Sequence, residues 1–264
     1  MSAKTAKLNF DAPRTARRAL YAGRLLPTTP PAPGAATAGV DVALAVRIST
    51  KAVRRFAGRV DRRLSRRTRN SKLRITLRRV YVTHSRSGRD IDHSGLAKGI
   101  AAAFADPRLE RVFRPRFIRT KAKITAREAR RRGRTVITIQ RSTFTLRLFK
   151  NLKRVKSYKV AVGQPGYPTP RGLFSIQSKQ VNPTWSVPNS PWAGELAGTT
   201  VTGGSASNPL RARWMGVSGS VGIHGTSQDG SIGTRASHGC IRMHVWDVIS
   251  LYNRVPMGTP VLIR

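Results

Sequence analysis

The single cysteine of the chain, Cys240, follows a glycine and lies close in sequence to His224 and His238. A thiol attacks carbonyl carbon as the thiolate, and an ordinary cysteine, with a pKa near ~8.5, is mostly protonated at neutral pH. A neighbouring imidazole can remove that proton, so the pattern indicates nucleophilic catalysis. Gly239 lets the backbone approach a substrate closely, which makes the N–H groups of Gly239 and Cys240 candidates for an oxyanion hole.

Other interpretations of these residues stay open. A lone cysteine is most often a small buried hydrophobic residue, and lone histidines are most often core or turn residues. Zinc also binds cysteine and histidine, but one cysteine without a paired motif falls short of the usual ligand spacing. Residue types alone do not decide whether His224 or His238 is the base, because each can reach the sulfur.

The flanking segments favour a shared site. Residues 221–223 form a short strand-like run that ends at His224. A loop of Gly, Ser and Asp at residues 226–234, in which Asp229 is interpreted as a loop residue, turns the chain back toward Cys240.

These segments resemble the catalytic domain of L,D-transpeptidases, the cysteine enzymes that cross-link bacterial peptidoglycan. The family signature is His-Gly-Thr, a spacer, and Ser/Thr-His-Gly-Cys followed two residues later by Asn or Arg. Residues 224–226 and 237–242 contain every element. The likeness extends over residues 134–264 and includes segments 169–176, 182–188, 243–248 and 255–263.

The resemblance implies that Cys240 is the nucleophile and His224 the base, with the carbonyl of Gly225 orienting the imidazole. It implies a fixed guanidinium at Arg242 that supports the loop or holds a substrate carboxylate. Arg235 is a weaker candidate for that carboxylate. The expected catalytic residues are Cys240, His224 and Gly239, and the expected substrate-binding residues are His238, Ser237, Arg242, Gly225 and Trp185.

The implied reaction is acyl transfer from a peptidoglycan stem tetrapeptide through a Cys240 thioester. Attack by an amine gives a cross-link, whereas attack by water gives L,D-carboxypeptidase activity, and the motif does not decide between them. The resemblance also implies acylation by carbapenems. Neither a metal nor an organic cofactor is indicated.

The charge of the chain supplies a third alternative, a non-catalytic basic protein. Fifty Lys and Arg residues against eleven Asp and Glu give a net charge of +39, spread over both halves. Such a field attracts polyanions, including anionic wall polymers and nucleic acid. Specific nucleic-acid recognition is not predicted, because no aromatic-rich strand motif or zinc-finger spacing accompanies the charge.

Residues 134–264 are predicted to form a mainly β catalytic domain, an antiparallel sandwich or barrel-like sheet with one short helix at 245–252. The segment 182–208 is predicted to be a long irregular loop and is a candidate lid over the cleft. Trp214 and Trp246 are predicted to pack against the core.

A small α+β domain is predicted at residues 41–128, and it resembles less specifically the peptidoglycan-binding domains that precede some L,D-transpeptidase domains. Its basic run up to Arg69 has helical spacing against apolar residues. Residues 72–83 alternate as a strand, 84–90 form a turn, and 96–104 form a helix after an Asp or Ser cap.

Residues 1–40 are predicted to be a separate helical segment followed by a Pro- and Ala-rich linker at 27–39. The proposed substrate implies a location in the cell wall or periplasm. However, residues 1–26 lack the apolar core of a secretory signal, and no run is long enough to span a bilayer. The expected explanation is that the natural chain begins upstream.

Overall fold

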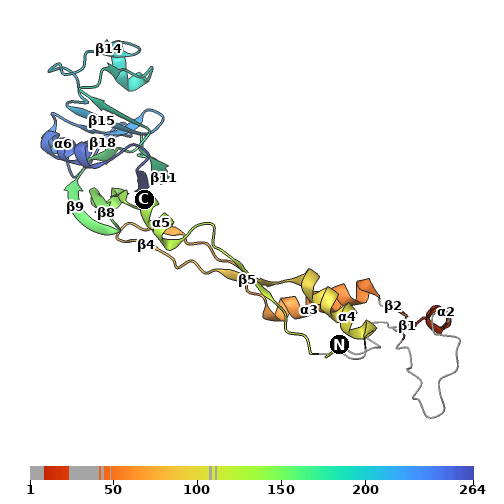
Figure 1. Ribbon diagram of the computed structural model, residues 1–264. Coiled ribbons are helices and arrows are strands. Elements are labelled where there is room, and N and C mark those ends of the chain that lie inside the picture. The colour runs from red at the N-terminus through yellow and green to blue at the C-terminus, as the bar shows by residue number, and fades with distance from the viewer. Residues whose placement is uncertain (1–8, 24–41, 43–44, 48, 107–108, 111) are drawn as a thin grey trace, which may run out of the picture. The chain divides into compact units, whose positions relative to one another are not determined.

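The computed structural model describes residues 9–23, 42, 45–47, 49–106, 109–110 and 112–264. The chain divides into two compact units (Figure 1). Unit 1 comprises Met1–Arg69 and Arg86–Ala122, and unit 2 comprises Asn70–Ser85 and Lys123–Arg264. The predicted linker at 27–39 lies outside the described residues.

Unit 2 contains two main β-sheets. The first has five strands, which follow the spatial order β11 (Gly172–Ser175), β19 (Pro260–Ile263), β7 (Thr135–Gln140), β8 (Thr145–Lys150) and β9 (Lys153–Lys159). The second has four strands in the order β12 (Ser178–Val181), β15 (Arg213–Ser218), β16 (Val221–Gly225) and β18 (Ile241–Met243). Neighbours within these two sheets pair antiparallel, except that β19 is parallel to β7 and β16 is parallel to β18.

Apolar side chains from both sheets form one core. The helix α6 (Val245–Arg254) contributes Val248 and Leu251 to this core, and it lies alongside β15 and β18 in Figure 1. The predicted mainly β fold with a short helix near the C-terminal end is confirmed. The largest fully buried members of the core include Ile137, Ile139, Leu146, Leu148, Met215, Ile223, Ile241 and Met243.

The run Thr135–Gln140 is buried almost throughout because both faces of β7 are covered. One face joins the main core, while Val136 packs with Val80 and Phe149 in a smaller cluster. Val80 belongs to a hairpin of β3 (Leu73–Ile75) and β4 (Val80–Val82). The prediction of a single strand at 72–83 is therefore wrong.

The same hairpin explains why the compact units differ from the predicted ranges 41–128 and 134–264. Residues 70–85 fall between the two ranges of unit 1 in the sequence but belong to unit 2. The buried Thr138 hydroxyl donates to the Leu77 carbonyl at 2.9 Å, which ties the hairpin to β7. The short helix α5 (Ala126–Arg132) also belongs to unit 2.

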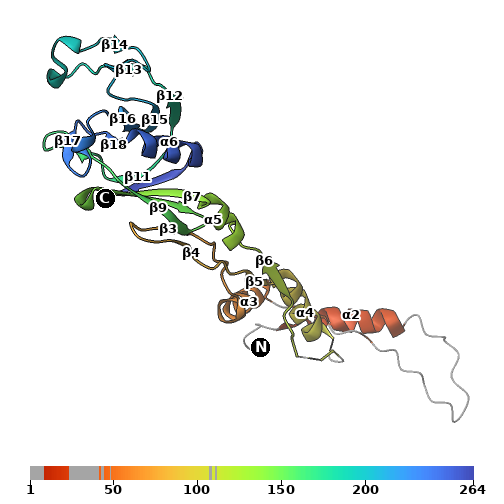
Figure 2. The same cartoon turned by 90° about the vertical axis from the view of Figure 1, so that its left-hand side faces the viewer.

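The segment 182–208 is not wholly irregular. It contains the paired strands β13 (Trp185–Ser186) and β14 (Thr200–Val201), with a 3₁₀ segment η2 (Pro191–Leu196) between them. In Figure 2, β13 and β14 lie beyond β12 at one end of the unit. Trp246 is 63% exposed, so the prediction that it packs in the core is wrong.

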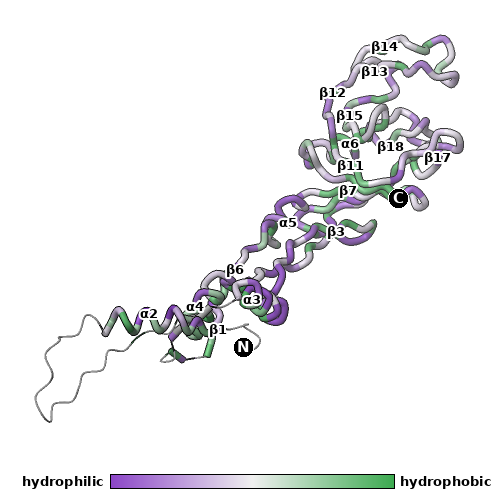
Figure 3. Tube along the Cα trace, turned by 90° about the vertical axis from the view of Figure 1, so that its right-hand side faces the viewer, coloured by the Kyte–Doolittle hydropathy of each residue, from purple (hydrophilic) through white to green (hydrophobic). Residues whose placement is uncertain are grey.

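Unit 1 is built around two helices, α3 (Thr50–Leu64) and α4 (His93–Ala105). Much of α3 is purple in Figure 3, the colour of hydrophilic residues. Its apolar residues pack with those of α4 in a buried cluster. The side chains of Ser49 and Asp92 cap these helices by accepting backbone N–H groups, which confirms the predicted Asp cap. The apolar residues buried between the helices are Val53, Ala57, Ile91, Leu96, Ile100 and Phe104.

Two local predictions for unit 1 are corrected. The basic helix ends at Leu64 rather than Arg69, because Arg66 and Arg69 form bridges with Arg89 and Arg86. The predicted turn at 84–90 overlaps β5 (Gly88–Ile91), which pairs with β6 (Phe117–Thr120).

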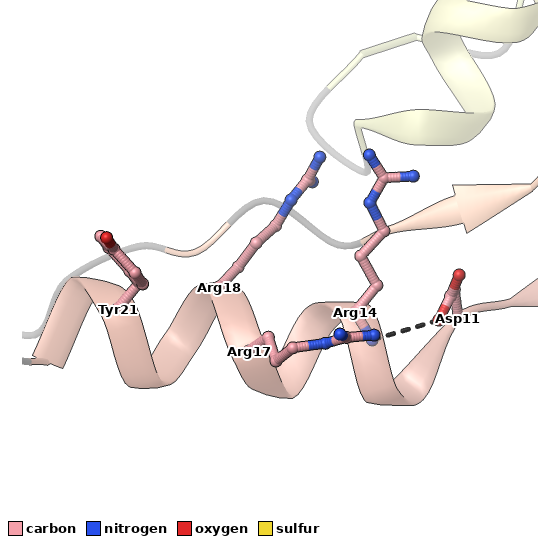
Figure 4. A pocket seen from close by; sticks show the side chains of 5 residues that line it. All are labelled: Asp11, Arg14, Arg17, Arg18 and Tyr21. Atoms are coloured by element: carbon pink, nitrogen blue, oxygen red, sulfur yellow. Dashed lines mark hydrogen bonds between the residues drawn. The ribbon is translucent and has the colours of Figure 1, made fainter.

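The N-terminal segment contains the predicted helical element as α2 (Ala12–Gly23). The short strand β1 (Asn9–Phe10) precedes this helix and pairs with β2 (Val46–Arg47). The Asp11 carboxylate accepts the Arg14 backbone N–H at 3.1 Å and caps the helix. Figure 4 shows the side chains that line a cavity beside this helix, Asp11, Arg14, Arg17, Arg18 and Tyr21.

Candidate active site

Strand register brings three of the site residues together. Trp214 on β15 lies opposite His224 on β16, and His224 lies beside Arg242 on β18. Directly paired residues of neighbouring strands project from the same face of a sheet. The indole of Trp214 stacks against the His224 imidazole with ring centroids 5.9 Å apart. All three side chains line one cavity.

The cysteine lies in the loop between β17 (Arg235–Ser237) and β18. The Ser237 hydroxyl donates to the Cys240 carbonyl at 2.6 Å and accepts the Gly239 N–H at 3.2 Å. The Thr169 hydroxyl donates to the Gly239 carbonyl at 2.8 Å. Gly239 has φ +110°, a conformation that favours glycine. These contacts hold the backbone on which the thiol is carried.

The Gly239 contact bears on the expected oxyanion hole. The sequence predicts that the Gly239 N–H donates to a substrate oxygen. In the structure this N–H donates to the Ser237 hydroxyl instead. Ser237 is 1% exposed, and both hydrogen bonds of its hydroxyl lie within the loop. Its hydroxyl therefore positions the loop, although the residue also borders the cavity.

The Cys240 thiol is partly exposed and donates to the Ser220 carbonyl at 3.6 Å. Burial raises the pKa of this thiol, and this effect outweighs two that lower it, the Gly222 N–H that donates to the sulfur and the charge of Arg242. The resting cysteine is consequently a neutral thiol at neutral pH.

The His224 imidazole is 4% exposed, and its Nδ1 lies 2.6 Å from the Gly225 carbonyl. A carbonyl only accepts, so Nδ1 carries the proton and Nε2 is the basic nitrogen. The pKa of His224 is lowered to about 4, mainly by burial of the ring. The Gly225 carbonyl raises this pKa by a smaller amount, and the charge of Arg242 lowers it further. The ring is therefore neutral at pH 7 and can accept a proton at Nε2.

An aromatic wall surrounds the second histidine. Trp192 stacks on His238 at 4.0 Å with an interplanar angle of 4°, and Trp185 stacks on Trp192 at 6.5 Å. Tyr167 meets the His238 ring edge-on at 5.0 Å. Burial, followed by the charge of Arg242, lowers the pKa of His238. His238 is thus a neutral stacking partner at pH 7.

The thiol and both histidines line one cavity of about 440 Å³. Its wall combines aromatic rings and prolines with a few polar groups, a composition typical of ligand pockets. Further lining residues include Gln180, Pro183, Thr184, Ser186, Pro188, Pro209 and Leu210.

Of the predicted substrate-binding residues, His238, Ser237, Arg242 and Trp185 border this cavity. Gly225 instead supplies the carbonyl that holds His224. Arg235 lines a different cavity of unit 2.

The sequence predicts neither the position of Trp214 in the cavity wall nor the contact of Asp229 with His244, two residues that do not line the cavity. Trp214 was predicted to pack in the core, yet it lines the cavity and stacks on His224. Asp229 was interpreted as a loop residue, yet its carboxylate lies 2.7 Å from Nδ1 of His244. The hairpin register between β15 and β16 is the signal that locates Trp214. No sequence spacing indicates the Asp229–His244 contact.

Arg242 is held in place by a hydrogen bond to the Gln228 side chain at 2.8 Å. Its guanidinium is half-buried at the cavity edge, where it lies beside His224 in the sheet register. A cation fixed in this way favours a negative group on a bound ligand. Within the described ranges, no cluster of three or more His, Cys, Asp and Glu residues is arranged to hold a metal ion.

Residues 134–263 match the YkuD family, described as the L,D-transpeptidase catalytic domain. YqjB of Bacillus subtilis, whose name assigns it to the same family, is 36% identical over 137 residues, which are 50% of this chain and 72% of that protein. YkuD of Bacillus subtilis is 39% identical over 129 residues, 48% of this chain and 63% of that protein. The chain therefore spans less than two thirds of the length of YkuD.

A solved structure of an Enterococcus faecium L,D-transpeptidase is 21% identical, with a TM-score of 0.43 over 83% of this chain and 84% of that one. The identity and the TM-score of this match are low, and the family assignment rests on the family model and the sequence relatives. The family match defines residues 134–263 as an L,D-transpeptidase catalytic domain. The chain belongs to the L,D-transpeptidase family.

Proposed function

We propose that the catalytic domain cross-links peptidoglycan stem peptides through a thioester on Cys240. The observation that carries the proposal is the placement of a partly exposed thiol and a neutral imidazole in one cavity. The His224 ring presents an unprotonated Nε2 because its Nδ1 is engaged by Gly225. This arrangement supports a general base that acts as the thiol attacks.

In the acylation step, His224 Nε2 takes the thiol proton while the sulfur bonds to the carbonyl carbon of the L-centre in the donor stem. The carbonyl oxygen becomes an oxyanion, for which the Cys240 N–H is the proposed donor. The intermediate collapses by breaking the bond to the D-residue nitrogen. The proton on His224 passes to that departing amine, and a thioester remains on Cys240.

In the second step, the amine of an acceptor stem attacks the thioester carbon. His224 removes a proton from the attacking nitrogen, the carbon–sulfur bond breaks, and the proton returns to the sulfur. The products are a new amide cross-link and the free thiol. Water in place of the amine yields a shortened stem and carboxypeptidase activity.

We assign the substrate contacts by chemistry. The half-buried Arg242 guanidinium suits a stem-peptide carboxylate, because it forms paired hydrogen bonds with planar anions. Trp185 and Trp192 offer flat apolar surfaces to the peptide. The proposed substrate also implies an extracytoplasmic site of action, and unit 1 is a proposed wall-binding domain. No described helix has the length and apolarity needed to cross a bilayer.

The test is incubation of the purified chain with tetrapeptide muropeptides, followed by mass analysis of the products. Cross-linked dimers support the proposal, tripeptide monomers alone indicate a carboxypeptidase, and absence of turnover indicates a non-catalytic protein. C240A is the control for background hydrolysis. Comparison of H224A with H238A tests the base, since only the former is expected to abolish acylation.

A carbapenem provides a second test of the nucleophile. We expect an adduct on the wild-type chain, measured by intact mass, because an acyl-enzyme can form without an acceptor amine. C240A is expected to remain unmodified. An adduct of equal yield on C240A would assign the acylated residue elsewhere.

A further inference from the structure

A second cavity of unit 2 is unusually rich in arginine. It has a volume of about 450 Å³ and shares no lining residue with the cavity of Cys240. Arg235 at the start of β17 lines it, whereas Ser237 at the end of the same strand borders the Cys240 cavity. The other lining residues are Leu77, Gln140, Arg141, Ser142, Val162, Gly163, Gln164, Pro165, Pro168, Arg171 and Arg264.

Positive side chains dominate the wall of this cavity. None of the lining side chains is acidic, and four of the lining residues are arginines. Burial, then the charges of Arg171 and Arg235, lower the pKa of Arg141. Arg141, Arg171 and Arg235 line the same cavity, and their mutual repulsion favours an anion between their guanidinium groups.

Arg141 also has unused hydrogen-bonding capacity. Its guanidinium donates through one terminal nitrogen to the Thr169 carbonyl, and Thr169 in turn is bonded to the Gly239 carbonyl, so the side chain is held in place. The buried Nε of Arg141 has no hydrogen-bond partner among the residues that the structure describes. The terminal guanidinium nitrogens carry further N–H groups, and a ligand oxygen in the cavity would accept hydrogen bonds from those.

We propose that this arginine cavity binds a phosphate group, either as free phosphate or as part of a polyol-phosphate polymer. Guanidinium groups match phosphate oxygens in pairs, and a phosphate accepts hydrogen bonds from several arginines at once. Its charge of up to two neutralises more of the cavity than one carboxylate does. The volume exceeds that of the ion alone, which leaves space for the polyol of an ester. The site is independent of the proposed acyl transfer.

The test is calorimetric titration of the full chain with inorganic phosphate and, separately, with a poly(glycerol phosphate), at fixed ionic strength. The test variant is R171Q/R235Q, because both side chains are exposed and their loss does not disturb the core. The control is R127Q/R154Q, which removes the same charge from exposed positions outside the cavity. We expect saturable binding that R171Q/R235Q weakens about tenfold or more, since a charged hydrogen bond contributes ~1.5–3 kcal/mol.

Binding of inorganic phosphate and polymer supports the polymer as source, and binding of inorganic phosphate alone supports the free ion. Equal losses in the two double variants overturn the proposal, because they indicate general charge attraction. Absence of saturable phosphate binding also overturns it. Acetate at the same ionic strength is expected to bind at least tenfold more weakly, and equal binding of acetate would contradict the assignment of phosphate.

Discussion

Cys240 and His224 line the same cavity, and both are neutral at pH 7. Burial disfavours the thiolate and the imidazolium alike. Cys240 and His224 are therefore not a thiolate–imidazolium pair before substrate binds. In the proposed reaction, the proton moves from sulfur to nitrogen as the thiol attacks the substrate. Arg242 enforces the same state at His224, where its positive charge opposes protonation.

The neutral thiol predicts slow alkylation at pH 7. We expect Cys240 to react with iodoacetamide more slowly than N-acetylcysteine in the same buffer, with a rate that keeps rising above pH ~8.5, because its pKa is raised above the ordinary value. H224Q is expected to change this profile little. The measurement is the pseudo-first-order rate from pH 5 to 10, and a rate plateau below pH 7 would instead show a thiolate–imidazolium pair.

His224 also predicts an acid-dependent loss of stability. Its folded pKa of about 4 lies below the unfolded value of 6.5, so the unfolded chain binds the proton more tightly. The stability from this group is complete above pH ~6.5 and is lost as the pH falls toward 4, by up to about 3 kcal/mol. Urea unfolding at pH 7.5 and 4.5 measures the change. H224Q is the comparison. Between the two pH values, its free energy of unfolding should fall by about 3 kcal/mol less than that of the wild type.

The reactive residues could be predicted from the sequence because they lie in two short motifs. His224, Ser237, His238, Cys240 and Arg242 all border the same cavity, as a shared site requires. Contacts that join distant segments could not be predicted in this way. Tyr167 reaches His238 from a loop far upstream, and nothing local in its sequence signals the contact.

At the scale of elements, strand register determines which side chains surround His224. Gly222 and His224 are two residues apart on β16 and share a face, as alternating strand residues do. The Trp214 indole lies across Gly222, where an added Cβ would come within 2.5 Å of the ring. The missing side chain thus makes room for the indole that stacks on His224.

Replacement of this glycine should disturb the site through the indole. We expect G222A to lower the free energy of unfolding by about 1–3 kcal/mol, because the rigid ring must move or the sheet must shift. Acylation of Cys240 by a carbapenem should also slow. G230A is the matched control, since a Cβ there meets no atom within 4 Å. Denaturant unfolding and intact-mass kinetics give the two readouts, and equal behaviour of the two variants would contradict the role of Gly222.

Elements were predictable where one physical pattern dominated. Alternating or continuous apolar runs located β7 and β8, and the apolar spacing of residues 245–252 located α6. The hairpin at 70–85 was missed as a hairpin because Thr76–Arg79 carries no Gly or Pro turn signal. Its turn is instead closed by the Thr76 and Arg79 backbone and hydroxyl contacts.

At the scale of the molecule, the net charge of +39 belongs to both units. The basic residues of α3, including Arg55, Arg59 and Arg62, are exposed, while its apolar residues pack against α4. This is the arrangement of a solvated helix face in a folded unit. Exposed arginines such as Arg127 and Arg130 on α5 make the same kind of surface in unit 2.

The distributed charge predicts that attraction to a long polyanion depends on total charge and not on one helix. We expect binding to poly(glutamate), a polymer without phosphate, to weaken steeply with added salt, since screening acts on exposed charges. R55Q/R59Q/R62Q and R127Q/R130Q/R154Q should weaken it to a similar extent, because each removes three positive charges from exposed positions. Fluorescence anisotropy over a series of NaCl concentrations measures both effects. A much larger loss in the α3 variant would identify α3 as a dedicated polyanion-binding surface and contradict the whole-molecule account.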